Sequence, residues 1–233
     1  MKSRTRKIWG IGLVALATVS VLAWYLKDDI IAQYYSMRLR NELSKQSRKR
    51  TDNPYNLHAV DSCIGLLHSG DLVLRTGADV ISHMLSQLNQ QNKTYSHCGI
   101  VMIEHGYPFV YHSIGGEDNP DEKLRRDSAS FFLSPASNLG FGIARLDADS
   151  AHINNIGKVV RRLYKEGHKF DLKFDLYSDD KLYCAEFVYK AINEAMQDST
   201  YIRPITKKGF RFVAVDNLYC NSHARLICQI EYK

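Results

Sequence analysis

The sequence lacks the short motifs that mark the common cofactor-dependent enzymes. It contains no glycine-rich dinucleotide-binding motif, no phosphate-binding P-loop, no HExxH zinc motif and no paired CxxC motifs. Proline and glycine are scarce, with 5 and 14 residues, which excludes collagen-like and low-complexity chains. These absences leave no signature for dinucleotide, nucleoside triphosphate or structural zinc binding, and the sequence predicts no cofactor.

An excess of positive charge is missing from most of the chain. Residues 1–50 contain eleven Lys/Arg and three Asp/Glu, whereas residues 51–233 contain twenty and twenty-two. The formal net charge of +6 therefore comes from the N-terminal region. A nucleic-acid-binding domain is expected to carry a basic stripe on its folded part, so this distribution disfavours a nucleic-acid partner. The length suits one core of about 150–200 residues with an appendage.

A long uncharged run follows the basic N-terminus. Four basic residues lie among the first seven, and nineteen uncharged residues, Ile8–Leu26, follow them. As a helix this run would span about 28 Å, close to the thickness of a bilayer core, and aromatic residues lie near both of its ends. We therefore expect a transmembrane signal anchor. A cleaved signal peptide, with Val21-Leu22-Ala23 as its cleavage site, remains the alternative.

Basic residues around this run also indicate its orientation. Four Lys/Arg precede it and three follow it closely, which favours a cytoplasmic N-terminus and a folded domain outside the cytoplasm. The expected domains are a cytoplasmic head and anchor over residues 1–27, a polar helical stalk over residues 28–55, and a folded domain over residues 56–233. Membrane contact is expected through residues 8–26.

Hydrophobic periodicity predicts a mixture of strands and helices in the folded part. Strands are expected at 72–74, 97–103, 109–114, 142–146, 210–215 and 226–230, and helices at 78–88, 151–166 and 184–196. Residues 117–140 are expected to form a loop with at most one short helix. The connection Glu104–Tyr107 has the length of a hairpin. This order of elements predicts an α+β fold with an antiparallel sheet.

A cysteine at position 184 begins one of the predicted helices. Unsatisfied N–H groups and the positive dipole end of a first helical turn favour a thiolate over a thiol. The same N–H groups can stabilise an oxyanion on a carbonyl that the sulfur attacks. Cysteine is also a common small residue of protein cores. Position alone therefore leaves Cys184 open as a nucleophile or as a structural thiol.

Two histidines are predicted on neighbouring strands. His97 begins its strand, and alternation along the strand places it on the opposite face from Cys98. His112 lies on the next strand, and the two Cβ atoms would be about 5 Å apart if the residues were cross-strand partners. One imidazole could activate a thiol while the other orients the first ring, as in acyl-transfer enzymes. A zinc site formed by His97, His112 and Cys184 remains an alternative.

Three separated motifs occur together in one order, namely Gly70–Val73, Tyr95–Val101 and Asp180–Val188. Together they resemble the circularly permuted branch of the NlpC/P60 (papain-like) cysteine hydrolases, and most closely its YiiX/YebB-like group. The lecithin:retinol acyltransferase family is a more distant match. In that branch the histidine strand precedes the cysteine helix, as it does here. The resemblance implies a permuted papain-like fold, with an antiparallel sheet or partial barrel packed on helices.

The same resemblance implies roles for individual residues. Cys184 corresponds to the nucleophile, His97 to the general base and His112 to the third, orienting residue. Many YiiX-like relatives have an acidic residue at the third position, whereas the acyltransferase branch has histidine. Cys98 occupies a position that is small and apolar in the family. Asp71 belongs to the first motif, and we expect it to cap a turn.

The resemblance also implies a function. It predicts a membrane-anchored cysteine hydrolase of the bacterial inner membrane that cleaves peptide amides of the cell wall. A lipid acyl hydrolase or acyltransferase is the first alternative. A non-catalytic, membrane-anchored binding module on the same fold is the second alternative.

The five cysteines do not identify the redox compartment. Cys220 and Cys228 lie eight residues apart near the C-terminus and are the candidates for a disulfide, whereas Cys63 has no evident partner. An odd number is compatible with one thiol kept free for chemistry. Unpaired cysteines in the cytosol would account for the count equally well.

Overall fold

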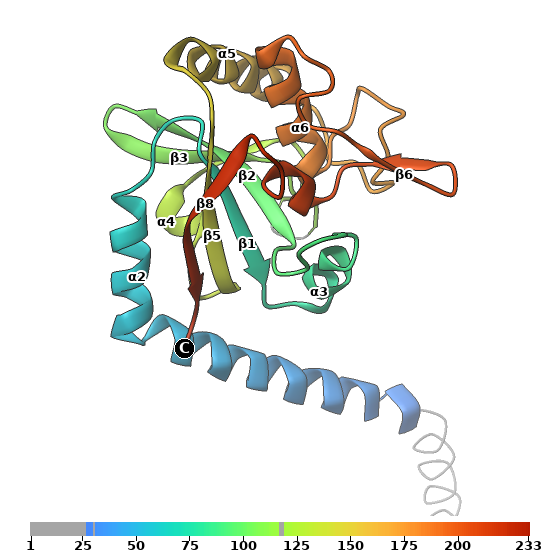
Figure 1. Cartoon of the computed structure of the whole chain (residues 1–233). Coiled ribbons are helices and arrows are strands. Elements are labelled where there is room, and N and C mark those ends of the chain that lie inside the picture. Colours follow the sequence, from blue (N-terminus) through green and yellow to red (C-terminus); the bar gives the residue numbers. More distant parts are fainter. Residues whose placement is uncertain (1–26, 30, 117–118) are drawn as a thin grey trace, which may run out of the picture. The chain divides into compact units, whose positions relative to one another are not determined.

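A computed structural model describes residues 27–29, 31–116 and 119–233 (Figure 1). The chain divides into two compact units, one up to Arg48 and one from Lys49 to the C-terminus. The anchor expected at residues 8–26 lies outside the described residues. Among the residues that are described, no helix is both long enough and apolar enough to cross a membrane.

The second unit is built on one antiparallel sheet with the strand order β4-β3-β2-β1-β5-β8. The strands are β1 (Leu72–Gly77), β2 (His97–Glu104), β3 (Tyr107–His112), β4 (Arg125–Ser128), β5 (Asn138–Leu146) and β8 (Ala224–Glu231). A separate hairpin consists of β6 (Ile205–Lys207) and β7 (Phe210–Phe212). Every neighbouring pair in the six-stranded sheet is antiparallel. The predicted α+β class with an antiparallel sheet is therefore confirmed.

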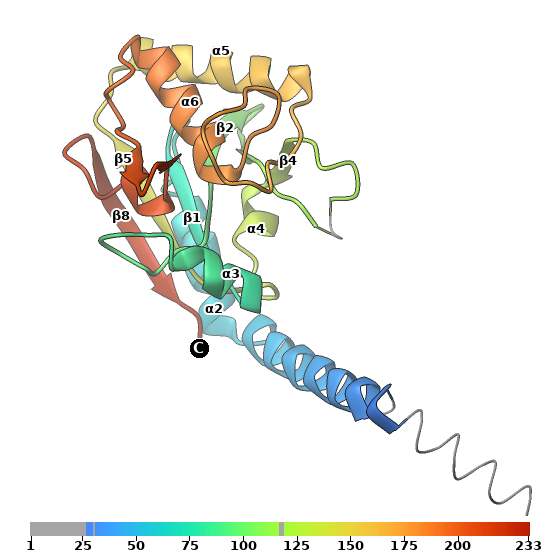
Figure 2. The same cartoon turned by 90° about the vertical axis from the view of Figure 1, so that its right-hand side faces the viewer.

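Helices cover both faces of this sheet (Figures 1 and 2). On one face α5 (Ser150–Glu166) and α6 (Cys184–Met196) pack on side chains such as Leu74 and Ile100. On the other face α2 (Pro54–Ile64) and α4 (Ala129–Phe132) pack on side chains such as Val73 and Val101. Successive residues of β1 and β2 therefore belong to different cores, because side chains alternate along a strand. A helical turn, η1 (Val215–Leu218), precedes β8.

The segment expected to be a loop with at most one short helix, residues 117–140, contains the short helix α4, the unexpected strand β4 and the first residues of β5. β4 pairs with β3, and Ser128 caps α4 by accepting a hydrogen bond from the N–H of Phe131 at 3.2 Å. Because β4 reads Arg-Arg-Asp-Ser, it lacks the alternation of apolar and polar residues by which strands are recognised. The strand expected at 210–215 is also shorter, since it ends at Phe212.

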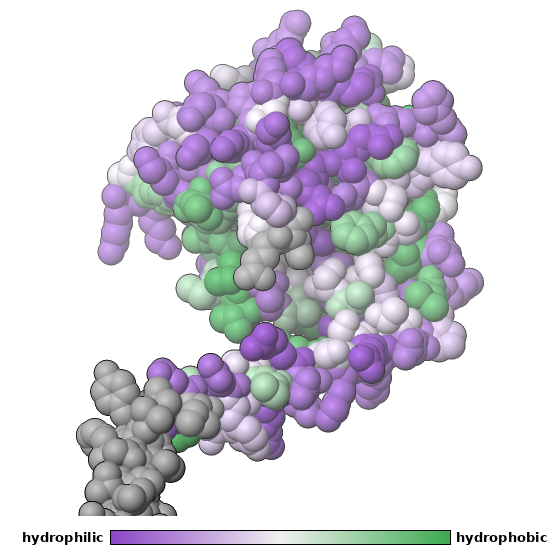
Figure 3. Space-filling model, turned by 180° about the vertical axis from the view of Figure 1, so that it is seen from behind, coloured by the Kyte–Doolittle hydropathy of each residue, from purple (hydrophilic) through white to green (hydrophobic). Residues whose placement is uncertain are grey.

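One short helix leaves much of its apolar surface exposed. α3 (Val80–Ser86) follows β1 and is capped by Asp79, which accepts a hydrogen bond from the N–H of Ser82 at 2.8 Å. Its exposed side chains are Val80, Ile81 and Met84, with exposed fractions of 72%, 64% and 62%. Figure 3 shows such hydrophobic side chains in patches on a mainly hydrophilic surface.

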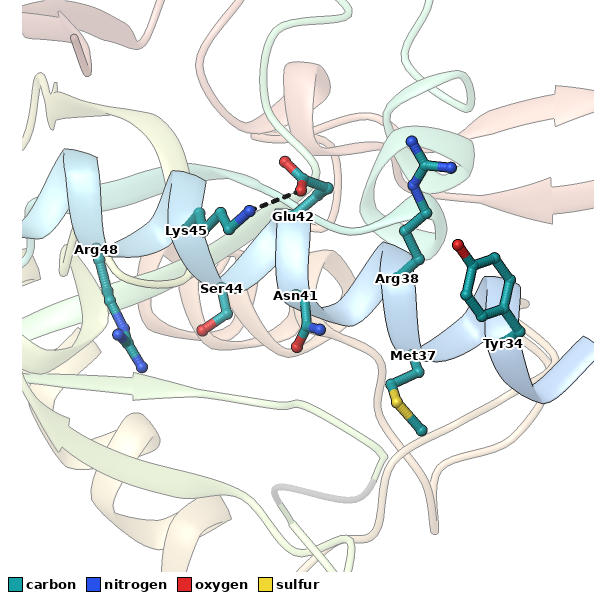
Figure 4. Close-up of a pocket in the computed structure, with 8 residues that line it drawn as sticks. All are labelled: Tyr34, Met37, Arg38, Asn41, Glu42, Ser44, Lys45 and Arg48. Carbon is teal, nitrogen blue, oxygen red and sulfur yellow. Dashed lines mark hydrogen bonds and ion pairs between the residues drawn. The ribbon is translucent and has the colours of Figure 1, made fainter.

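The first unit is a helix as far as the structure describes it. Residues 27–29 and 31–48 are helical, and their side chains are almost all exposed. Along this helix lies an open hollow of about 460 Å³ (Figure 4). Its lining includes the ion pair between Lys45 and Glu42, with Nζ and Oε1 3.0 Å apart, but no thiol and no imidazole. This hollow therefore lacks the groups that nucleophilic catalysis requires.

The folded unit begins before the expected start at residue 56. The Asn56 side chain is buried and donates hydrogen bonds to the carbonyl groups of Arg50 at 2.8 Å and Lys233 at 2.9 Å. These bonds attach the start of α2 to the C-terminal residue of the chain. The unit consequently includes the residues from Lys49 onward.

A disulfide joins Cys63 of α2 to Cys228 of β8, whereas Cys220 is free. The suggested pairing of Cys220 with Cys228 is therefore wrong. Cys228 lies opposite Ile143 in the sheet, on the side where α2 packs, and Cys220 follows η1. Closeness in the sequence did not identify the partner, because the pairing depends on how α2 packs on the sheet.

Replacing both Cys63 and Cys228 with alanine should lower the free energy of unfolding by about 2–5 kcal/mol, because the crosslink closes a very long loop of the unfolded chain. Urea denaturation of the oxidised proteins measures this change. Cys220→Ala is the control and should keep the wild-type midpoint. Equal midpoints for the double variant and the wild type would contradict a stabilising crosslink.

Candidate active site

The two predicted histidines meet on one face of the sheet. His97 Nε2 lies 3.0 Å from His112 Nδ1. The register pairs Ile100 with Tyr111, so His112 is opposite Gly99 and only diagonal to His97. A Cβ atom at Gly99 would lie 3.0 Å from the Cβ of His112, so the glycine leaves room for the diagonal contact. The expected contact exists, but not between direct cross-strand partners.

Asp127 on β4 extends this pair to a hydrogen-bonded chain. His112 Nε2 lies 3.0 Å from Asp127 Oδ2, and Arg125 Nη2 donates to Asp127 Oδ1 at 2.7 Å. A carboxylate only accepts hydrogen bonds, so His112 carries its proton on Nε2 and accepts with Nδ1. His97 then donates from Nε2, which leaves its Nδ1 with a free lone pair.

The Nδ1 atom of His97 lies outside the hydrogen-bonded chain, on a side chain that is largely buried, with an exposed fraction of 8%. This atom has no hydrogen-bond partner among the described residues. It is also not one of the fully buried polar atoms that lack a partner. The hydrogen bonds from His97 through His112 to Asp127 therefore use every ring nitrogen except Nδ1 of His97, and Nδ1 keeps its lone pair as a basic site.

Burial keeps both imidazoles neutral. It lowers the pKa of His97 well below the ordinary value, and the positive charge of Arg75 adds to this effect. Burial also lowers the pKa of His112 to about 4, although the hydrogen bond to Asp127 opposes the shift. For Asp127 burial alone would raise the pKa, but hydrogen bonds from His112 and Arg125 lower it overall. At neutral pH the chain thus combines two neutral rings with a carboxylate.

Cys184 is the first residue of α6, as predicted. The N-cap is Tyr183, whose N–H donates to Oε2 of Glu186 at 3.3 Å, and this bond satisfies one of the free donors at the helix start. Phe187 and Val188 in the same turn are fully buried in the core beneath the helix. Packing and capping therefore fix the position of Cys184, whose exposed fraction is 5%.

Cys98 holds the Cys184 sulfur beside the histidine strand. Both the thiol and the backbone N–H of Cys98 are hydrogen-bonded to this sulfur. Because that N–H belongs to the peptide bond between His97 and Cys98, the sulfur lies next to the His97 backbone. Among the described residues, no hydrogen bond links the Cys184 sulfur to the His97 ring. Catalytic hydrogen bonds are often long without substrate and shorten when it binds.

Hydrogen bonding lowers the pKa of Cys184. The largest contribution comes from the Cys98 thiol, burial opposes it, and the N–H groups of Cys98 and Ala185 and the charge of Arg75 lower the pKa further. Burial and the shared hydrogen bond raise the pKa of Cys98 well above that of an ordinary thiol. Cys184 is thus the more acidic thiol of this pair, with Cys98 as the hydrogen-bond donor to its sulfur.

Replacing Cys98 with alanine should raise the pKa of Cys184, because the variant loses the S–H donor. We expect the alkylation of Cys184 by iodoacetamide to slow several-fold at neutral pH and its pH profile to move upward by about one unit. Mass spectrometry of the labelled peptide measures both changes. Cys98→Ser keeps a donor and should stay close to the wild type. An unchanged profile in Cys98→Ala would contradict the assigned hydrogen bond.

Two charged residues of this region, Asp127 and Arg75, were not predicted. Asp127 lies in a polar strand that offers no hydrophobic pattern. Arg75 follows Leu72-Val73-Leu74, and alternation places it on the face of Val73, which is buried. A charge on the buried face of a strand was the available signal for Arg75, whereas no comparable signal exists for Asp127.

Asp71 has the structural role expected of it. Its Oδ2 atom accepts a hydrogen bond from the N–H of His68 at 2.8 Å, which closes the turn before β1. Its carboxylate also receives two hydrogen bonds of 2.8 Å from the Arg145 guanidinium. The capping role is confirmed, and the ion pair with Arg145 explains how this carboxylate is buried.

Comparison with solved structures shows a likeness at the level of the fold. No family model and no curated protein matches the chain. A crystal structure of the metalloprotein yiiX from Escherichia coli O157:H7 aligns with a TM-score of 0.58 and 16% identity, over 70% of this chain and 98% of that chain. A likeness at this identity concerns the fold alone, and it extends neither to the NlpC/P60 family nor to lecithin:retinol acyltransferase. The chain therefore has a YiiX-like fold.

Proposed function

We propose that this protein is a cysteine hydrolase of the amidase or peptidase type, with Cys184 as nucleophile, His97 as general base and His112 as orienting residue. The observation that carries this proposal is the chain from His97 through His112 to Asp127. It leaves one basic nitrogen on His97, whose backbone adjoins the Cys184 sulfur. Nucleophile, base and orienting group are the parts that acyl transfer requires.

In the proposed mechanism, Nδ1 of His97 takes the proton of the Cys184 thiol as the sulfur attacks a carbonyl carbon. Backbone N–H groups at the start of α6 stabilise the oxyanion that forms. His97 then gives the proton to the leaving amine or alcohol, and an acyl-enzyme remains. A water molecule that loses its proton to His97 hydrolyses this thioester. Through their hydrogen bonds, His112 and Asp127 keep His97 in the required tautomer.

The proposed substrate is a peptide amide of the bacterial cell wall. This choice follows the resemblance to the NlpC/P60 hydrolases and the expected anchor at residues 8–26, which would hold the domain at the outer surface of the inner membrane. Because peptidoglycan lies outside the cytoplasm, an anchored hydrolase with that orientation would reach it.

A lipid acyl hydrolase or acyltransferase is the second candidate, and one observation favours it. The apolar side chains of α3 are exposed, and this helix packs against β1 and β2, the strands of Arg75 and His97 (Figure 2). Apolar surface beside an active site suits a substrate with acyl chains.

A zinc-dependent mechanism does not fit the residues present, although the E. coli neighbour is described as a metalloprotein. The facing nitrogens of His97 and His112 bind each other, and the remaining nitrogen of His112 binds Asp127. Only His97 Nδ1 and the Cys184 sulfur remain, whereas a catalytic zinc takes three protein ligands. Among the described residues, no group of three or more His, Cys, Asp or Glu side chains could hold a metal ion.

Mass spectrometry of reaction products tests the proposed function. Purified protein is incubated separately with muropeptides and with phospholipid vesicles, and each reaction is repeated with Cys184→Ala. Cleavage of muropeptides by the wild type alone is the expected result, and cleavage of phospholipids alone would favour the second candidate. Equal cleavage by Cys184→Ala would refute Cys184 as nucleophile. Binding of either class without cleavage would identify a binding module instead.

A further inference from the structure

Arg75 shares a wall of the site with both histidines. It is the register partner of His97 across β1 and β2. Its guanidinium carbon lies 4.6 Å from the centre of the Phe132 ring. The centre of that ring is 5.5 Å from the centre of the His97 ring and 4.9 Å from that of His112. Phe132 therefore fixes the arginine and the two imidazoles relative to one another.

The Arg75 guanidinium is half-buried and has little to bind. It makes one long hydrogen bond, from Nη1 to the carbonyl oxygen of Phe132 at 3.5 Å, and no ion pair among the described residues. Arg145 shows the contrast, because Asp71 receives two bonds of 2.8 Å from it. A guanidinium has five N–H donors, so Arg75 keeps most of its donors available.

The charge of Arg75 acts on the groups proposed to react. It contributes to the lowered pKa of Cys184 and to the lowered pKa of both histidines. The negative charge of Asp127 is already bound by Arg125 and His112. Arg75 thus provides a positive charge that acts on the sulfur, and among the described residues no carboxylate forms an ion pair with it.

We propose that Arg75 binds an anionic group of the substrate, a carboxylate or a phosphate, next to the carbonyl that Cys184 attacks. The planar fork of a guanidinium matches both groups through paired hydrogen bonds. This inference rests on the proposed function and narrows it to substrates that carry an anion near the scissile bond. A peptide with a free carboxylate beside the amide meets this requirement, and so does a glycerophospholipid.

Paired alkylating reagents test this role without knowledge of the natural substrate. Iodoacetate carries a carboxylate, whereas iodoacetamide is its neutral counterpart. The rates at which both label Cys184 are measured by mass spectrometry in the wild type, Arg75→Gln and Arg75→Lys. The ratio of the two rates is the readout, because a change in the pKa of Cys184 affects both reagents alike.

We expect Arg75→Gln to lower the ratio of the iodoacetate rate to the iodoacetamide rate about tenfold, because the variant loses a charge-assisted hydrogen bond to the carboxylate of iodoacetate. Arg75→Lys should recover only part of it, because lysine keeps the charge and loses the fork. Arg126→Gln is the matched control, since Arg126 also stacks on a phenylalanine but pairs with Glu104 on the other face of the sheet. Its ratio should equal that of the wild type.

A protection experiment on the wild type distinguishes the two anions and needs no variant to fold. Glutarate should slow labelling by iodoacetamide if the site takes a carboxylate, and glycerol 1-phosphate should do so if it takes a phosphate. An unchanged ratio in Arg75→Gln, or no protection by either anion, would overturn the role of Arg75 and leave the proposed function intact. Failure of both reagents to label Cys184 in the wild type would refute the proposed function itself.

Discussion

Replacing His97 with glutamine is expected to reduce the steady-state hydrolysis of p-nitrophenyl acetate about 10²–10⁴-fold, the usual contribution of a general base. The leaving group of this ester departs without a proton, so the first turnover needs His97 least. Release of the acyl group needs a base for water, and Nδ1 of His97 is the base that we propose. We therefore expect the burst of nitrophenol to persist while the following steady state almost disappears.

Stopped-flow absorbance separates these two phases. His58→Gln is the matched control, because His58 is exposed on α2 and does not belong to the hydrogen-bonded chain of His97, His112 and Asp127. It should retain both phases, and thermal unfolding should show that both variants fold. A wild-type steady-state rate in His97→Gln would contradict the assignment of His97 as base.

Replacing Asp127 with asparagine is expected to lower turnover about 10²–10⁴-fold, because the substitution changes the tautomers of His112 and His97. An asparagine amide can donate to His112 Nε2, which reverses the tautomer of His112. Its Nδ1 would then donate to His97 Nε2, so the proton of His97 would move to Nδ1. A ring protonated there cannot accept a proton from Cys184 or from water.

The tautomer argument makes a finer prediction. Asp127→Ala removes the orienting carboxylate without donating a hydrogen bond, so it should lose less activity than Asp127→Asn. Asp179→Asn is the control, because Asp179 is an exposed partner of Lys190. Nitrogen NMR of the histidine rings reports the tautomers directly. Wild-type tautomers together with lost activity in Asp127→Asn would contradict this account.

The sequence alone identified the groups that lie in regular, patterned elements. Cys184 begins an amphipathic helix, and His97 and His112 lie on apolar strands, so periodicity gave the positions of all three residues and the shared sheet face of the two histidines. The helix of Cys184 packs on the opposite face. The diagonal contact of the histidines could not be predicted, because register depends on the turn and on Gly99. The order of the three motifs further predicted a YiiX-like fold, and the structural comparison supports this prediction.

Other features depend on tertiary packing that leaves no local pattern. Asp127 lies on a polar strand at the edge of the sheet, where β4 pairs with β3. The disulfide between Cys63 and Cys228 joins residues that are 165 positions apart. The hydrogen bond of Cys98 to Cys184 links a strand to a helix, whereas the sequence indicated only a small core residue at that position.

The rate at which each free thiol reacts with iodoacetamide at neutral pH tests the central claim most directly. Burial alone predicts that the partly exposed Cys220 reacts first, because Cys184 and Cys98 are buried. The pKa of Cys220 is raised by burial, whereas hydrogen bonds lower that of Cys184. An activated nucleophile at position 184 should therefore be labelled well ahead of both other thiols. Labelling of Cys220 first would show that the Cys184 sulfur is an ordinary buried thiol.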